Sequence, residues 1–128
     1  MLRIVLALFY GTAGLLHLFL PRPFIGIVPS WVPEPAVTVA LTGVAELAGA
    51  IGLLQPSPSL RRAAGWGLAA YALCVWPANF QHMLLDQAKP GGGLDLGYHI
   101  PRLAAQPLLM WLALWASGAI DWPRTRHA

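Results

Sequence analysis

Charged residues are scarce in this sequence, and their scarcity excludes most soluble folds. Only 10% of the 128 residues are Asp, Glu, Lys or Arg, whereas 57% are hydrophobic, and the mean hydropathy is +0.60. Soluble domains usually carry about 25% charged residues. A chain this apolar could not cover its surface in water. We therefore expect an integral membrane protein, because lipid then replaces water as the solvent of its surface.

The sequence also has almost no cysteine and no cluster of basic residues. Cys74 is the single cysteine, so the chain by itself holds neither a disulfide nor a dithiol redox centre. The eight Lys and Arg residues form no basic stripe and lie mostly at the ends of apolar runs. That placement is typical of membrane topology signals and not of nucleic-acid binding. We expect no nucleic-acid partner, and we interpret Cys74 as a small buried hydrophobic residue.

Four long apolar runs dominate the sequence, and no alternating strand pattern competes with them. They cover about residues 2–20, 36–54, 60–85 and 98–120, and a membrane-spanning helix needs roughly 20 such residues. The sequence thus predicts an all-α fold, a single integral membrane domain over residues 1–128 that forms a four-helix bundle. The first connection, 21–35, is proline-rich yet apolar. We expect it to lie in the outer interface or to fold back over the mouth of the bundle.

The distribution of basic residues predicts the orientation of the bundle. With four spans, five arginines fall on one side, whereas Arg22 and Lys89 fall on the other. Because cytoplasmic ends carry the excess of Lys and Arg, both termini are expected in the cytoplasm. The five arginines are Arg3, Arg61, Arg62, Arg124 and Arg126.

Several polar residues interrupt the apolar runs, although polar groups in the hydrocarbon are costly and need partners or a purpose. Depth along each predicted helix places them in the outer half of the bilayer, with Glu46 near its middle. None can face lipid cheaply, so we expect them to point inward and to line a ligand-binding pocket. The candidate ligand-binding residues are His17, Glu46, Asn79, His82, Arg102 and Gln106.

The chemistry of these residues suggests specific pairings. Arg102 keeps its charge and needs a carboxylate or an anionic ligand, so we expect a Glu46–Arg102 pair, direct or through water or Gln106. His17 and His82 titrate near neutral pH and are suited to relaying protons or holding a ligand carbonyl. The catalytic candidates are therefore Glu46, His17 and His82. The structural alternative is that these groups only join helices, contributing about 0.6 kcal/mol each.

A metal site is the weaker interpretation of the same residues. His17, His82 and Glu46 would supply two imidazoles and one carboxylate, a known ligand set for transition metals. No close spacing such as His-x-x-x-His supports that set, and a neighbouring arginine disfavours a cation. We expect no metal.

The combined motifs resemble the DoxX-like membrane proteins over nearly the whole chain. The matching segments are residues 13–21 with Phe24, residues 27–29 and 32–35, residues 43–49, residues 76–79, residues 102–107 and residues 111–114. The resemblance implies a multi-pass four-helix bundle in the bacterial inner membrane. Relatives include a subunit of a thiosulfate:quinone oxidoreductase, MauE-type proteins and sterol-binding or sterol-isomerising proteins. The family pattern keeps polar residues at His17, Glu46, Asn79, Arg102 and Gln106.

Two departures from that resemblance narrow the function. The chain has no redox cysteine pair, which weakens a MauE-like thiol role, and only one carboxylate inside a predicted span, which weakens a two-carboxylate sterol isomerase. The leading hypothesis is a redox-accessory protein that binds a small amphipathic ligand, such as a quinone, beside a redox partner protein. The alternatives are an acid–base enzyme acting on a lipid-soluble substrate, a structural or assembly subunit without ligand, and a transporter that forms homo-oligomers. The sequence does not decide whether the chain is an enzyme.

Overall fold

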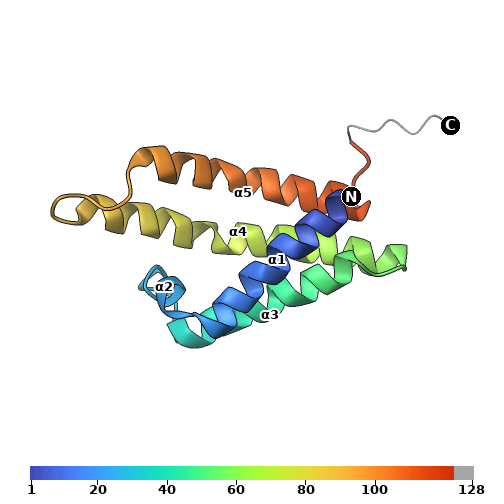
Figure 1. The fold of residues 1–128 in the computed structure, drawn as a ribbon, viewed down its shortest axis with the longest axis horizontal. Helices are drawn as coiled ribbons and strands as arrows, with labels where there is room; N and C mark the ends of the chain where they lie inside the picture. Colours follow the sequence, from blue (N-terminus) through green and yellow to red (C-terminus); the bar gives the residue numbers. More distant parts are fainter. Residues whose placement is uncertain (123–128) are drawn as a thin grey trace.

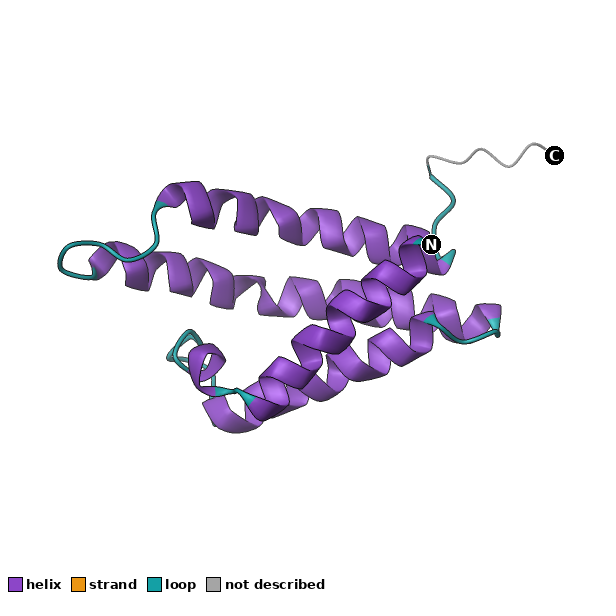
Figure 2. Cartoon of the chain, viewed as in Figure 1, coloured by secondary structure: helices purple, strands orange, loops and turns teal. Residues whose placement is uncertain are grey.

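The structure is a computed structural model that describes residues 1–122, and it is all-helical over that range (Figure 2). This result confirms the predicted all-α class. Pro123, which was expected to follow the last span, and Arg124 and Arg126, which enter the orientation argument, lie outside the described residues. The helices are α1 (Leu2–Phe19), α2 (Arg22–Ile25), α3 (Pro35–Leu53), α4 (Pro58–Ala88) and α5 (Leu96–Ser117) (Figure 1).

Local sequence signals explain where these helices begin and end. Pro35 and Pro58 occupy the first positions of α3 and α4, where the missing N–H costs nothing. The Asp95 side chain accepts a hydrogen bond from the Tyr98 backbone N–H and caps α5. Gly118 ends α5 in the left-handed conformation with φ of 76°. A long helix covers each of the four apolar runs, and α4 continues to Ala88, beyond the expected end at residue 85.

The long helices pack as two pairs, α1 with α3 and α4 with α5, and α3 joins the pairs through α4. In Figure 1 the pairs lie close together near the N-terminus and diverge toward the end that carries α2. The close end holds the apolar core. The diverging end leaves room for a site. The core residues are Leu6, Ala7, Tyr10, Ala50, Leu53, Leu68 and Ala113.

Two helices of the described chain, α1 and α3, are long and apolar enough to cross a membrane, by length and composition alone. The predicted third and fourth spans do not meet the same measure. Their helices contain buried polar residues, namely Asp86 in α4 and His99 and Gln106 in α5. Such residues lower the mean hydropathy of a helix without exposing a polar face to its surroundings.

Candidate functional site: a polar-ended cavity between the helix pairs

A cavity of about 480 Å³ opens where the helix pairs diverge. Its walls come from all four long helices and from the 21–35 connection, which contributes Phe24 and Trp31. A second hollow of about 200 Å³, lined by Met1, Leu2, Arg3, Trp115 and Ala116, lies at the other end of the bundle and has no cluster of titratable groups. We therefore place the candidate site in the larger cavity. Its polar lining residues include Tyr10, His17, Glu46, Tyr71, Asn79, Arg102 and Gln106.

Glu46 is the buried carboxylate of this cavity, with only 4% of its surface exposed. The Tyr71 hydroxyl donates a hydrogen bond of 2.6 Å to its Oε1. His17 Nδ1 lies 2.7 Å from Oε2 but also 2.8 Å from the Ala13 carbonyl oxygen. One N–H cannot point at both oxygens, and Oε2 receives no aligned hydrogen bond within the described chain. His17 thus supplies electrostatic proximity to Glu46, whereas Tyr71 supplies the hydrogen bond.

Close contact between α1 and α3 brings His17 to Glu46. A Cβ atom added to Gly14 would lie 2.8 Å from the Gly43 carbonyl oxygen, and one added to Gly43 would lie 3.0 Å from the His17 Cβ. Only glycine permits the two backbones to approach this closely, as small residues commonly do between membrane helices. The mouth is held from the same side, because the His17 ring packs against Phe24 of α2 with ring centroids 3.9 Å apart.

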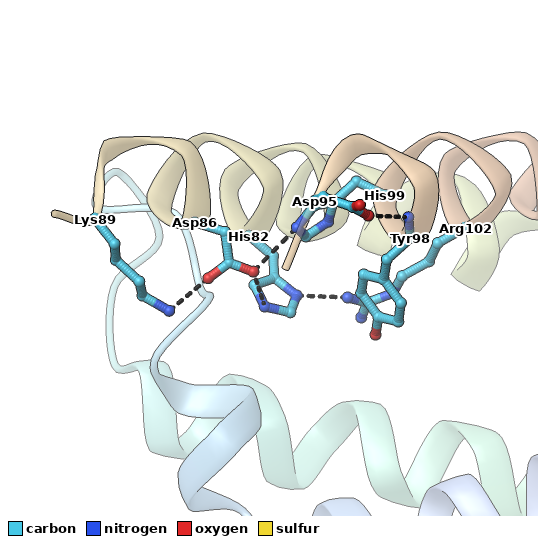
Figure 3. A network of polar contacts seen from close by, with 7 residues as sticks. All are labelled: His82, Asp86, Lys89, Asp95, Tyr98, His99 and Arg102. Atoms are coloured by element: carbon cyan, nitrogen blue, oxygen red, sulfur yellow. Dashed lines mark hydrogen bonds and ion pairs between the residues drawn. The ribbon is translucent and has the colours of Figure 1, made fainter. Parts of the chain in front are cut away.

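Arg102 lines the cavity from α5 and leads into a second polar network (Figure 3). Its Nη1 lies 2.5 Å from His82 Nδ1. Asp86 Oδ2 lies 3.2 Å from His82 Nε2 and 3.0 Å from His99 Nε2, and Oδ1 accepts from Lys89. Because guanidinium can only donate, His82 must accept at Nδ1. His82 Nε2 lies in ion-pair contact with Asp86, so Arg102 is held by a hydrogen bond to His82, which in turn contacts Asp86.

His82, Asp86 and His99 also form a candidate metal group, since one ligand atom from each lies within 4.8 Å of the others. This set differs from the His17, His82 and Glu46 set considered from the sequence. Metal binding at His82 Nε2 would move the ring proton to Nδ1, where it would face the guanidinium of Arg102. Lys89 adds a second cation at Asp86. The donors present fit a hydrogen-bonded cluster better than a cation site.

Gln106 and Asn79 occupy the wall between the two polar regions. The Gln106 side chain is buried and its Nε2 donates to the Ala72 carbonyl oxygen at 3.1 Å, which ties α5 to α4. The Trp76 indole N–H makes a similar link to the Leu103 carbonyl oxygen at 3.0 Å. Asn79 lines the cavity three residues before His82. These links fix the α4–α5 wall on which Arg102 is carried.

The comparison with family models gives one match, to a family described as a domain of unknown function (DUF8561), over residues 6–118. This chain belongs to that family. The matched range runs from α1 to the end of α5 and so includes every residue of the cavity and of the Arg102 network. No curated protein and no solved structure matches the chain.

In this member of the family, five of the six residues predicted from the sequence line one cavity. They are His17, Glu46, Asn79, Arg102 and Gln106. His82 is not part of the lining and reaches the cavity through Arg102. Glu46 and Arg102 form no direct pair within the described chain, because Glu46 contacts Tyr71 and His17 and Arg102 contacts His82. The expected pairing through water or Gln106 stays a prediction.

Sequence reasoning overlooked four residues that shape the site. Tyr10 and Tyr71 were counted with the apolar runs, although both line the cavity and the Tyr71 hydroxyl donates to Glu46. Asp86 follows the predicted third span and was not a candidate residue, yet it is only 1% exposed. The spacing of His82 and Asp86, four residues apart on one helix face, was the available signal. His99 was noticed but not included, and it proves to be fully buried against Asp86.

Proposed function

We propose that this chain is a multi-pass protein of the bacterial inner membrane, a DoxX-like four-helix bundle with both termini in the cytoplasm. The support is the surface. Large hydrophobic side chains are exposed on every long helix, for example Leu8, Leu41, Leu73 and Leu108. Only 22% of the α1 span and 33% of the α3 span are buried, whereas a core helix of a soluble protein would be mostly buried. Lipid is the solvent that suits such a surface.

We further propose that the cavity binds a small amphipathic ligand, such as a quinone, and that the protein is an accessory to a redox partner. The observation that carries this proposal is the cavity of about 480 Å³, which joins apolar walls to a few polar groups. Small-molecule sites have this composition and a volume of about 300–1,000 Å³. Arg102 and His17 would bind the oxygens of the ligand head, and the apolar wall at Phe24 and Trp31 would contact its tail.

The second candidate function is acid–base catalysis on a lipid-soluble substrate. It is favoured by the grouping of Glu46 with the Tyr71 hydroxyl and His17 at the cavity wall, because positioned carboxylate, phenol and imidazole groups are typical proton-transfer residues. Under this function, Glu46→Gln would abolish turnover of added substrate while the protein still bound it. Under the accessory function, the same variant would change ligand affinity without any turnover in the wild type.

The deciding experiment is mass spectrometry and ultraviolet spectroscopy of small molecules extracted from the protein purified in mild detergent. We expect a stoichiometric lipophilic molecule in the wild type and its loss in Arg102→Ala. Arg22→Ala, which changes an exposed arginine of α2 outside the cavity lining, is the matched control and should retain the ligand. Arg102→Lys tests whether charge alone suffices. A wild type that carries no ligand and binds neither added decyl-quinone nor its quinol would contradict the proposal.

A further inference from the structure

Two buried polar atoms beside the cavity have no hydrogen-bond partner within the described chain. They are the Tyr10 hydroxyl oxygen and Glu46 Oε2. Both residues line the cavity, and both are almost fully buried, at 2% and 4% exposure. Unsatisfied buried polar groups are rare in native proteins because each costs about 1–3 kcal/mol. A pair of them on one cavity wall indicates a group that binds there.

The two atoms belong to one cluster. The Tyr71 hydroxyl donates to the other oxygen of Glu46 at 2.6 Å, and the Tyr10 ring packs edge-on against the Tyr71 ring with centroids 6.5 Å apart. The orphaned hydroxyl is free to donate, and the orphaned carboxylate oxygen can only accept. The missing partner must therefore accept from Tyr10 and donate to Glu46.

We propose that the cavity selects a lipophilic phenol or alcohol, whose hydroxyl donates to Glu46 Oε2 and accepts from the Tyr10 hydroxyl. This inference rests on the proposed ligand-binding function and names the chemical class of its ligand. Of a quinone and quinol couple, the cavity takes the quinol, because the quinone carries only acceptor oxygens and would leave Oε2 unsatisfied. The apolar remainder of the ligand then lies against the wall formed by Phe9, Phe24 and Val75.

Other polar heads fit less well. A ketone or ether accepts from Tyr10 but donates nothing to Glu46. A carboxylate is repelled by the buried charge of Glu46. An ammonium group donates to Glu46 but cannot accept from Tyr10, and it shares the cavity with the permanent charge of Arg102. A hydroxyl meets both atoms at once through a single oxygen.

The test uses two probes of similar shape, 4-hexylphenol and 1-fluoro-4-hexylbenzene, which differ in the ability to donate. Calorimetric titration of the full chain in dodecyl maltoside gives both affinities, and 4-hexylbenzylamine tests the cationic rival. The variants are Tyr10→Phe and Glu46→Gln. Tyr98→Phe is the matched control, since Tyr98 is exposed and lies outside the cavity lining. Comparing each variant with the wild type cancels the partition of the probes into micelles.

We expect the wild type and Tyr98→Phe to prefer the phenol by about tenfold or more, because a site built around a hydroxyl rejects an analogue that lacks it. The preference should fall in both Tyr10→Phe and Glu46→Gln. It should fall further in Glu46→Gln, which weakens the acceptor of the phenol proton, than in Tyr10→Phe, which removes only the donor to the phenol oxygen. Equal affinity for phenol and fluoro probe in the wild type would overturn this inference and leave the ligand-binding function standing. So would a preference that Tyr10→Phe leaves undiminished, or tighter binding of the amine. Failure of every probe to bind would overturn both. Should Glu46→Gln not fold, Tyr10→Phe alone decides.

Discussion

The molecule holds two buried carboxylates, and they differ in how completely the chain satisfies them. Asp86 has a hydrogen-bond donor on each oxygen, Lys89 on Oδ1 and His99 on Oδ2, and His82 adds an ion-pair contact. Glu46 has one aligned donor, Tyr71, and an Oε2 that no described group satisfies by a hydrogen bond. A carboxylate that its own chain satisfies stabilises the structure around it, whereas one left partly open at a cavity wall is available to a ligand.

The positions of the two carboxylates agree with that division. Asp86 lies at the end of α4 and contacts Lys89 one turn later and His99 across the loop in α5, and its backbone carbonyl accepts from the Gly93 N–H. It therefore fixes the α4–α5 hairpin. Glu46 draws its neighbours from two other helices, His17 of α1 and Tyr71 of α4. It lies where the helix pairs separate, which is where a ligand can enter.

The largest effect is expected from Asp86→Ala, which leaves Lys89 and His99 without their acceptor and His82 without its ion-pair contact. Removing one partner of a buried charged cluster is strongly destabilising, because the remaining charges stay desolvated and unpaired. We expect a loss of thermal stability several times that of Asp95→Ala, a matched substitution that removes only the cap of α5 and costs about 1 kcal/mol. Melting curves in detergent measure both. Equal losses would show that Asp86 is not the structural carboxylate of the pair.

The second effect concerns the helix contact that brings His17 to Glu46. In Gly14→Leu the new side chain would begin with a Cβ 2.8 Å from the Gly43 carbonyl oxygen, so α1 and α3 must separate. We expect a stability loss of about 1–3 kcal/mol together with weaker binding of 4-hexylphenol. The control is Gly67→Ala, where an added Cβ meets nothing within 4 Å and helix propensity favours alanine by about 1 kcal/mol. Unchanged binding in Gly14→Leu would show that the His17–Glu46 approach is not needed.

The third effect separates the two tyrosines beside Glu46. Tyr71→Phe removes the hydroxyl that donates to Oε1, and hydrogen bonds to charged groups contribute about 1.5–3 kcal/mol. Tyr10→Phe removes a hydroxyl without a partner in the described chain, so the ligand-free protein should lose no stability and gain some. Melting curves without added ligand measure both variants. A comparable loss in both would mean that the Tyr10 hydroxyl is part of the fold and not of the ligand site.

These contrasts also show what the sequence could and could not predict. The helices follow from local information, because long apolar runs bounded by Pro35, Pro58 and Gly118 are expected to form α-helices. The burial cost of polar residues brought His17, Glu46 and Arg102 to one cavity without any motif. Which of these side chains contact one another was harder to predict, since the depth of a residue along a helix does not fix the rotation of that helix about its axis. Glu46 meets His17 because α1 and α3 approach at Gly14 and Gly43, and it meets Tyr71 across the α3–α4 interface. Both contacts join segments far apart in sequence.

Asp86 was missed for a related reason. It lies just after the predicted third span, which ends at residue 85, and its burial depends on α4 continuing to Ala88 and on the loop at residues 89–95 folding back onto it. The sequence contained the pair His82 and Asp86 at helical spacing, but only the placement of His99 from α5 makes that pair a closed network. Residues whose role depends on contacts between distant segments are thus harder to predict from the sequence than polar residues inside an apolar helix, which are costly to bury in any arrangement.

The smallest expected effect is the pH dependence of the Asp86 network. Asp86 follows the predicted third span, which ends at residue 85. The hydrogen bond from Lys89 lowers the pKa of Asp86 below its usual value, and the hydrogen bond from His99 acts in the same direction. Because the native carboxyl binds its proton less readily than the unfolded one, its stabilisation is complete above the unfolded pKa near 3.8 and is lost as pH falls through the lowered native value. Melting curves from pH 7 to pH 2 should therefore show the wild type losing stability below about pH 4 more steeply than Asp86→Asn. Subtracting the two curves isolates the carboxyl from His82 and His99, which face it. The effect stays modest because a protonated carboxyl still fills the same space and still forms hydrogen bonds. Parallel curves for the wild type and Asp86→Asn would mean that the charge of Asp86 does not contribute to its interactions with Lys89 and His99.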